Sequence, residues 1–198
     1  MPHTCIENQA VRDILCYAQA RGTPVSVIEH PRESVTCADK RSLMLEHAHL
    51  YANYGDIRIA RGALLSIDSN SGRAPVLHLA DSEDRIDFKG LRRLLGVRKK
   101  GDIRFCPGNI EASIGLPVGG VSPFVAPHAR LDCLVFAGSL FGSARHQSLP
   151  RWDFAFNRLQ SVVIDARTLM AYMIDRKHFR IYLLDATSDV ESAVSARS

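Results

Sequence analysis

The sequence has no long hydrophobic run. No apolar stretch approaches the roughly 18 residues that a membrane-spanning helix needs. The first residues, MPHTCIENQAVRDILC, contain no apolar core of the kind found in signal peptides. We therefore expect a soluble protein that is located in the cytoplasm and has no membrane partner.

The sequence lacks a paired arrangement of cysteines. The chain contains five cysteines, an odd number, and no CxxC pair, which argues against a disulfide framework and against a zinc knuckle. His47 and His49 are two positions apart, so on a helix they would face different directions and would not share a metal ion. We predict that the protein has no metal site.

The chain also lacks internal repeats, low-complexity segments and a strong excess of one charge. Its 198 residues, 46% of them hydrophobic, are enough for one full core and too few to make two average domains the better prediction. We predict one domain over 1–185 and a flexible polar tail over 186–198. The formal net charge of +4 permits a phosphate-bearing partner without requiring one.

Helical and strand-like patterns alternate irregularly along the chain. Apolar residues recur at helical spacing from Ile6 to Ala18, and Thr36, Asp87 and Asp165 are suitable N-caps for further helices. The irregular order predicts a mixed-sheet α+β domain. The expected helices cover 6–20, 38–52, 88–96, 108–115 and 166–173, and the expected strands cover 24–30, 57–68, 75–81, 102–106, 131–138, 153–158, 161–165 and 179–185.

One segment fits neither a helix nor a strand. The stretch IGLPVGGVSPFVAP at 114–127 contains three glycines and three prolines among apolar residues. Glycine lets backbone N–H groups approach a ligand closely, and proline holds the shape of a loop. The segment therefore indicates either a ligand-binding loop or a rigid loop that only packs two strands together.

The order of these motifs resembles the YbaK/ProX family of aminoacyl-tRNA deacylases. The resemblance covers about residues 22–170, and its most specific part is FKGLRRLLG at 88–96 followed by GLPVGGVSPF at 115–124. Family members are single domains, or insertions in prolyl-tRNA synthetases, that hydrolyse the ester of a mischarged tRNA. The resemblance implies a central mixed, partly barrel-like β-sheet flanked by helices.

The resemblance also implies roles for individual residues. Arg61 stands where the family has a lysine that anchors substrate, while Gly119, Gly120 and Ser122 would hold the ester and the attacking water. An arginine keeps the positive charge, but it is longer, planar and a poor proton donor. The alternative interpretation is that Arg61 is an ordinary surface arginine and that Val118, Val121 and Phe124 are core side chains. The residues implied to bind substrate are His30, Val118, Val121, Pro123, Phe124 and Asn157.

Five basic residues follow one another closely around the end of the helix expected over 88–96. They could bind the phosphates of tRNA through salt-sensitive contacts, or they could form a solvated helix face. No aromatic residue is interleaved with these charges, as a platform for stacking single-stranded bases would require. The five residues are Arg92, Arg93, Arg98, Lys99 and Lys100.

Two functions remain open from the sequence. The first is a trans-editing hydrolase that removes a small amino acid from mischarged tRNA with bound water as the nucleophile and without metal or organic cofactor. Its partner would be tRNA, and an aminoacyl-tRNA synthetase is a further candidate partner. The alternative is a catalytically inactive module that binds aminoacyl-tRNA, an aminoacyl nucleotide or a protein partner.

Overall fold

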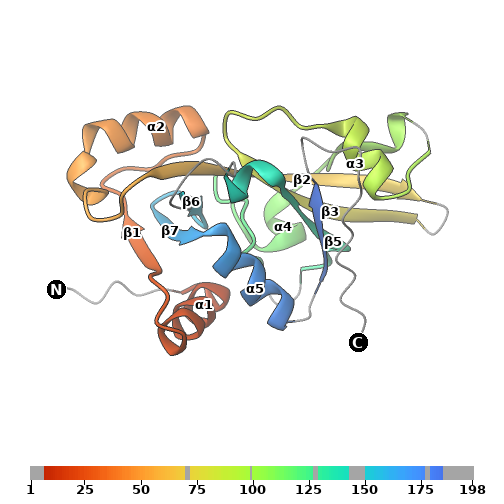
Figure 1. Cartoon of the computed structure of the whole chain (residues 1–198). Helices are drawn as coiled ribbons and strands as arrows, with labels where there is room; N and C mark the ends of the chain where they lie inside the picture. Colours follow the sequence, from red (N-terminus) through yellow and green to blue (C-terminus); the bar gives the residue numbers. More distant parts are fainter. Residues whose placement is uncertain are drawn as a thin grey trace.

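The fold is built on a mixed sheet of eight strands (Figure 1). The computed structural model describes residues 7–69, 72–98, 100–126, 129–142, 150–176 and 179–184. The tail predicted over 186–198 lies outside these residues. The strands are β1 Ser26–Glu29, β2 Ile57–Ser69, β3 Gly72–Asp81, β4 Ile103–Phe105, β5 Cys133–Ala137, β6 Arg151–Ala155, β7 Gln160–Asp165 and β8 Arg180–Leu184.

Strand β2 lies at the centre of the sheet. The strands are ordered β1-β7-β6-β2-β3-β5-β8, and β4 also pairs with β2. The pairs β2–β6, β3–β5 and β5–β8 are parallel, and the other pairs are antiparallel. The predicted mixed sheet is confirmed. Among the described residues it stays open between β1 and β8, so the partly barrel-like form that we expected does not close into a barrel.

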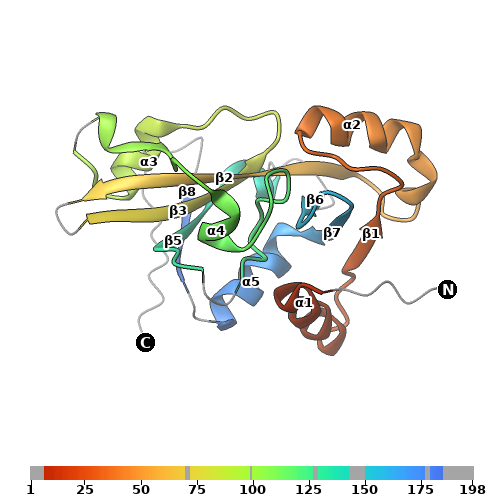
Figure 2. The same ribbon diagram turned by 180° about the vertical axis from the view of Figure 1, so that it is seen from behind.

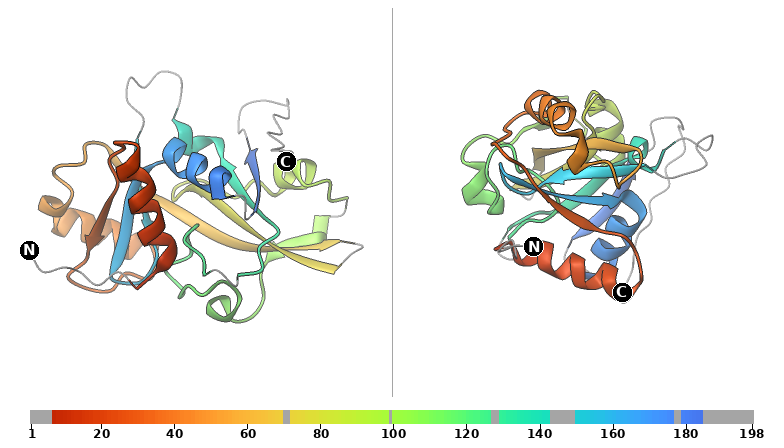
Figure 3. Two further views of the ribbon diagram at one scale, coloured as in Figure 1. Left: turned by 90° about the horizontal axis from the view of Figure 1, so that it is seen from below. Right: turned by 90° about the vertical axis from the view of Figure 1, so that its left-hand side faces the viewer.

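Helices cover both sides of the sheet (Figures 1 and 2). Helices α1 and α5 pack together on one side and lie nearest the viewer when the molecule is seen from below (Figure 3), while α2 and α3 lie on the other side. No helix in the described ranges is long and apolar enough to cross a membrane. The helices are α1 Gln9–Ala20, α2 Cys37–Glu46, α3 Phe88–Leu94, α4 Ile110–Ile114 and α5 Ala166–Arg176.

The largest hydrophobic core joins the sheet to α1 and α5. Trp152 and Phe154 of β6 are buried in it, and the indole N–H of Trp152 donates a hydrogen bond of 2.7 Å to the carbonyl oxygen of Leu140. A second, smaller core lies beneath α3, where Leu91 is fully buried. These two cores hold β2 and β3 in place from opposite sides.

The predicted elements are present, and their caps are the predicted ones. Thr36 and Asp39 form a capping box at the start of α2, and the side chain of Asp87 accepts two hydrogen bonds from the first turn of α3. Several boundaries differ from the prediction: the strand expected over 153–158 is β6, Arg151–Ala155, and the helix expected over 38–52 ends at Glu46. His47 leaves the helical conformation (φ −122°, ψ 43°), and a separate 3₁₀ turn, Ala48–Leu50, follows.

Candidate functional site

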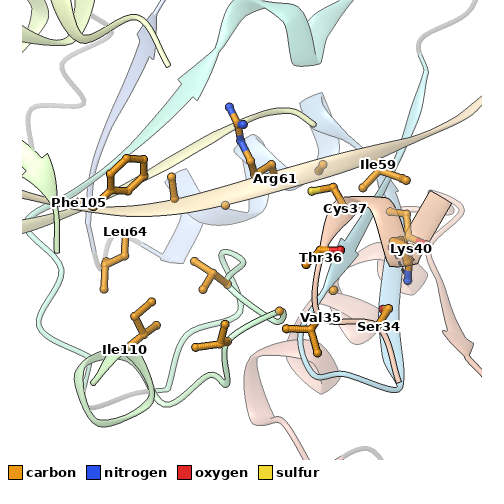
Figure 4. A pocket seen from close by; sticks show the side chains of 18 of the residues that line it. Ser34, Val35, Thr36, Cys37, Lys40, Ile59, Arg61, Leu64, Phe105 and Ile110 are labelled. Atoms are coloured by element: carbon orange, nitrogen blue, oxygen red, sulfur yellow. Dashed lines mark ion pairs between the residues drawn. The ribbon is translucent and has the colours of Figure 1, made fainter. Parts of the chain in front are cut away.

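A pocket of about 320 Å³ opens beside β2 (Figure 4). Its floor is formed by residues 59–64 of β2, one wall comes from 34–37 and the first turn of α2, and the facing wall comes from the glycine-rich loop. The segment around β4 and α4 closes a third side. Most lining groups are apolar. Besides the floor, the lining residues are Ser34, Val35, Thr36, Cys37, Lys40, Phe105, Cys106, Ile110, Val118, Gly119, Val121, Asp153 and Ala155.

Two glycines allow the loop to lie against the other walls. A Cβ atom at Gly62 would stand only 2.1 Å from the carbonyl oxygen of Val121, so β2 and the loop meet backbone to backbone. Gly119 has a φ of +92°, and a Cβ there would lie 2.8 Å from the Cα of Val35. The close packing of the loop therefore requires glycine both at Gly62 of β2 and at Gly119 of the loop itself.

The glycine-rich loop serves both the pocket and the core. Val118, Gly119 and Val121 line the pocket. The N–H of Gly120 donates a hydrogen bond of 2.9 Å to the carbonyl oxygen of Pro117 and so closes a turn. The hydroxyl of Ser122 is buried, does not line the pocket, and has no hydrogen-bond partner among the described residues.

The residues at the end of the predicted motif belong to the core. Pro123 and Phe124 are buried, and the ring of Phe124 meets those of Phe154 and Phe156 edge to face, each at 6.5 Å between ring centroids. Neither residue lines the pocket. The alternative interpretation of Phe124 as a core side chain therefore fits its position.

Arg61 borders the pocket, but its guanidinium is engaged elsewhere. Nη2 donates a hydrogen bond of 2.5 Å to the carbonyl oxygen of Asp84. In Figure 4 the side chain extends to the opposite side of β2 from Leu64 and Ile110. The buried Nε has no partner among the described residues. Arg61 thus lies at the edge of the site rather than at its centre.

A group of five polar side chains, which we call the Lys40 cluster, is buried beside the pocket, and two of its members, Lys40 and Asp153, also line it. Lys40 Nζ lies 3.1 Å from Asp153 Oδ1 and 3.0 Å from Ser161 Oγ, and it also contacts His30 Nε2. The contact with Asp153 is an ion pair, because neither carboxylate oxygen of Asp153 has a hydrogen-bond partner among the described residues. The fifth member, Tyr51, places its hydroxyl 3.3 Å from His30 Nδ1. The cluster therefore ties α2 to β1, β6 and β7.

Burial sets the protonation of the cluster. It lowers the pKa of Lys40 and raises the pKa of Asp153, because each charged form loses water, while their mutual attraction opposes both shifts. Burial, with the charge of Lys40, lowers the pKa of His30 to about 3. At neutral pH the imidazole of His30 is therefore uncharged.

Lys40 and Asp153 were not predicted from the sequence as site residues. A signal was present for Asp153, which is the one acid in an apolar strand between Trp152 and Phe154, where a buried charge needs a partner. Lys40 stands three positions before the buried Leu43 and so shares its helix face. No local pattern connects the two residues, because they meet only through the tertiary fold.

Two other predicted binding residues lie outside the pocket lining. His30 belongs to the Lys40 cluster. The side chain of Asn157 accepts hydrogen bonds from the N–H groups of Leu159 and Gln160 and donates one to the side chain of Gln160. Asn157 therefore shapes the turn between β6 and β7.

Thiols line the pocket without forming a metal centre. Burial raises the pKa of Cys37, while the nearby charges of Arg61 and Arg41 oppose the shift. The thiol of Cys37 is therefore protonated at neutral pH. Within the described residues, no group of three or more His, Cys, Asp or Glu side chains is arranged to hold a metal ion.

The basic residues are only partly described. Arg92 is half-buried on α3, and Arg93 and Arg98 are exposed. Lys99 and the side chain of Lys100 lie outside the described residues. Of these basic residues, Arg93 and Arg98 are therefore accessible to solvent.

Comparison with solved structures supports the fold. A structure titled "Crystal structure of hypothetical protein APE2540" matches with a TM-score of 0.56 and 18% identity, over 82% of this chain and 93% of that chain. At this identity the likeness shows the fold alone. No family model matches the chain, and no curated protein matches it.

Proposed function

We propose that the protein hydrolyses the ester bond of a mischarged aminoacyl-tRNA. The observation that carries the proposal is the position of Gly119, which lines a mainly apolar pocket opposite the first turn of α2. The motif order shared with the YbaK/ProX deacylases supports the same function. An aminoacyl ester is already activated, so the site needs to position water and to stabilise an oxyanion, with no nucleophilic side chain.

Backbone groups are the best placed to stabilise the oxyanion. The N–H of Gly119, unlike that of Gly120, has no partner within the described part of the chain. Across the pocket, the dipole of α2 favours negative charge near its first turn. Both features favour a transition state in which the acyl oxygen gains negative charge.

The reaction is a simple hydrolysis. The oxygen of water bonds to the acyl carbon, the bond from that carbon to the ribose oxygen breaks, and a proton from the water passes to the ribose oxygen. The products are a free amino acid and a tRNA with a free terminal hydroxyl. No electron transfer is involved.

The apolar lining favours a small amino acid. Ile59 and Leu64 on the floor and Val121 on the loop restrict the space for an acyl side chain. A synthetase gains only about 1–3 kcal/mol from one methylene, so a second site that admits small side chains corrects its errors. We propose that this pocket is such a site.

The proposal is tested by deacylation of tRNAs charged separately with Ala, Ser, Cys, Thr and Pro. We expect release of at least one small amino acid, and slower release by Arg61→Ala because a positive charge at the edge of the site is lost. Leu45→Ala is the control, since Leu45 is 79% exposed and does not line the pocket. Absence of release from every tRNA would contradict the proposal.

The second candidate is a binding module without catalysis, favoured by the bond between Arg61 and the Asp84 carbonyl oxygen. That bond holds the guanidinium of Arg61 away from the pocket, whereas the resemblance to the YbaK/ProX family implies a substrate-anchoring cation at this position. Arg61→Lys distinguishes the two functions. Hydrolysis that appears only in Arg61→Lys supports the binding module, whereas hydrolysis by the native chain supports the enzyme.

A further inference from the structure

An aromatic ring stands exposed at the mouth of the pocket. Phe105, the last residue of β4, is 62% exposed and also lines the pocket. Hydrogen bonds hold β4 against β2, and the N–H of Cys106 donates to the carbonyl oxygen of Leu64 at 2.9 Å. The backbone that carries the ring is therefore fixed, while most of the ring surface is open.

A second ring supports Phe105 from behind. Phe88 meets it edge to face, with 6.1 Å between ring centroids and an angle of 82° between ring planes. This contact restrains Phe105 and still leaves most of its surface exposed. A large apolar side chain that is both restrained and exposed is suited to stacking against a flat ligand.

The same contact brings a basic helix to the pocket. Phe88 is the first residue of α3, which also carries Lys89, Arg92 and Arg93. Lys89 and Arg92 form no ion pair with any described residue. The fold thus supplies from β4 the aromatic ring that the basic segment lacks in the sequence.

We infer that Phe105 stacks on a nucleobase at the single-stranded end of the RNA substrate. This inference rests on the proposed function, which places the acyl group inside the pocket and the attached nucleotide at its mouth. The base lies on the face of Phe105, and the phosphates beyond it face the cations of α3. Stacking on an aromatic ring is tolerant of base identity, so it positions the end of the RNA while selecting no sequence.

The test is binding of the trinucleotide CCA, measured by NMR titration, to the native chain and to Phe105 variants. We expect Phe105→Ala to weaken binding about 5- to 100-fold, the range typical of one lost base stack, and Phe105→Trp to retain it. A trinucleotide whose last residue has no base should bind the native chain and Phe105→Ala equally. Leu45→Ala, which removes an exposed apolar side chain on α2, is the matched control.

The outcomes separate this inference from the proposed hydrolysis. CCA binding that depends on Phe105 supports stacking even if no tRNA is deacylated, and in that case only the hydrolysis fails. Equal CCA binding by the native chain and Phe105→Ala, or no binding by either, overturns the stacking even if deacylation is observed.

Discussion

Lys40 and Asp153 form an ion pair that solvent barely reaches. Their side chains are 5% and 0% exposed, so each charge depends on the other for compensation. Removing one partner leaves a buried, unpaired charge. We expect Lys40→Met to lower the free energy of unfolding by about 3–5 kcal/mol, measured by chemical denaturation.

An exposed ion pair provides the comparison. Arg32 lies 3.0 Å from Glu46, but both side chains are about half exposed. Arg32→Met should therefore cost less than about 1 kcal/mol. The double variant Lys40→Met, Asp153→Leu removes both buried charges and should regain much of the stability lost in the single variant. Equal losses in Lys40→Met and Arg32→Met would contradict the role of burial.

Two buried histidines make the fold sensitive to acid. Burial is the main cause that lowers the pKa of His30 to about 3 and that of His78 to about 4, from 6.5. Because the unfolded chain binds these protons more readily, the stability present above pH 6.5 is lost as pH falls toward 4. Each histidine contributes a slope of up to about 1.4 kcal/mol per pH unit.

His78→Leu tests this dependence. Both ring nitrogens of His78 are buried without a hydrogen-bond partner among the described residues, and leucine has no such groups to leave unpaired. We expect the variant to be about 1 kcal/mol more stable at pH 7 and to lose less stability between pH 6.5 and pH 4. Denaturation curves at several pH values measure both effects, and an unchanged slope would contradict them.

For single residues, the sequence predicts which residue types form the site better than it predicts which groups they bond to. The glycine-rich loop was predicted, and Gly119 does line the pocket. The use of the Gly120 N–H within a turn and the bond from Arg61 to Asp84 depend on local geometry that spacing does not specify. The same limit applies to Lys40 and Asp153, which lie on different elements.

The glycine-rich loop and β2 form one packed unit. Gly62→Ala would place a Cβ atom 2.1 Å from the carbonyl oxygen of Val121, so the loop must move away from the strand. We expect a loss of about 1–3 kcal/mol in the free energy of unfolding, as is typical of overpacking, measured by chemical denaturation. The control is Gly101→Ala, because a Cβ atom at Gly101 has no neighbour within 4 Å. Equal stability of the two variants would show that the loop is not held against β2.

The helices and strands were predictable because the sequence patterns that indicate them are local. Helical periodicity identified α1, and N-caps located the starts of α2 and α3. The end of α2 was not predictable in this way, since the polar and apolar residues after Glu46 continue without a glycine or proline. The helix ends because the backbone of His47 leaves the helical conformation.

At the scale of the whole molecule, the topology creates the pocket. Strand β2 pairs with β3, β4 and β6, so segments from both halves of the chain meet over its middle. The sequence predicted a mixed sheet from the alternation of elements. It did not specify the strand order, because pairing between distant strands depends on long-range contacts rather than on local patterns.

The proposed hydrolysis depends on the pocket beside β2. Val118 lines it and is 53% exposed, so Val118→Trp can fill the pocket without disturbing the core. The most direct measurement is the rate of aminoacyl-tRNA deacylation by the native chain, Val118→Trp and the control Leu45→Trp, with folding checked by circular dichroism. We predict hydrolysis by the native chain and by Leu45→Trp and its loss in Val118→Trp. Hydrolysis that is unchanged in folded Val118→Trp, or absent from the native chain, would contradict the account.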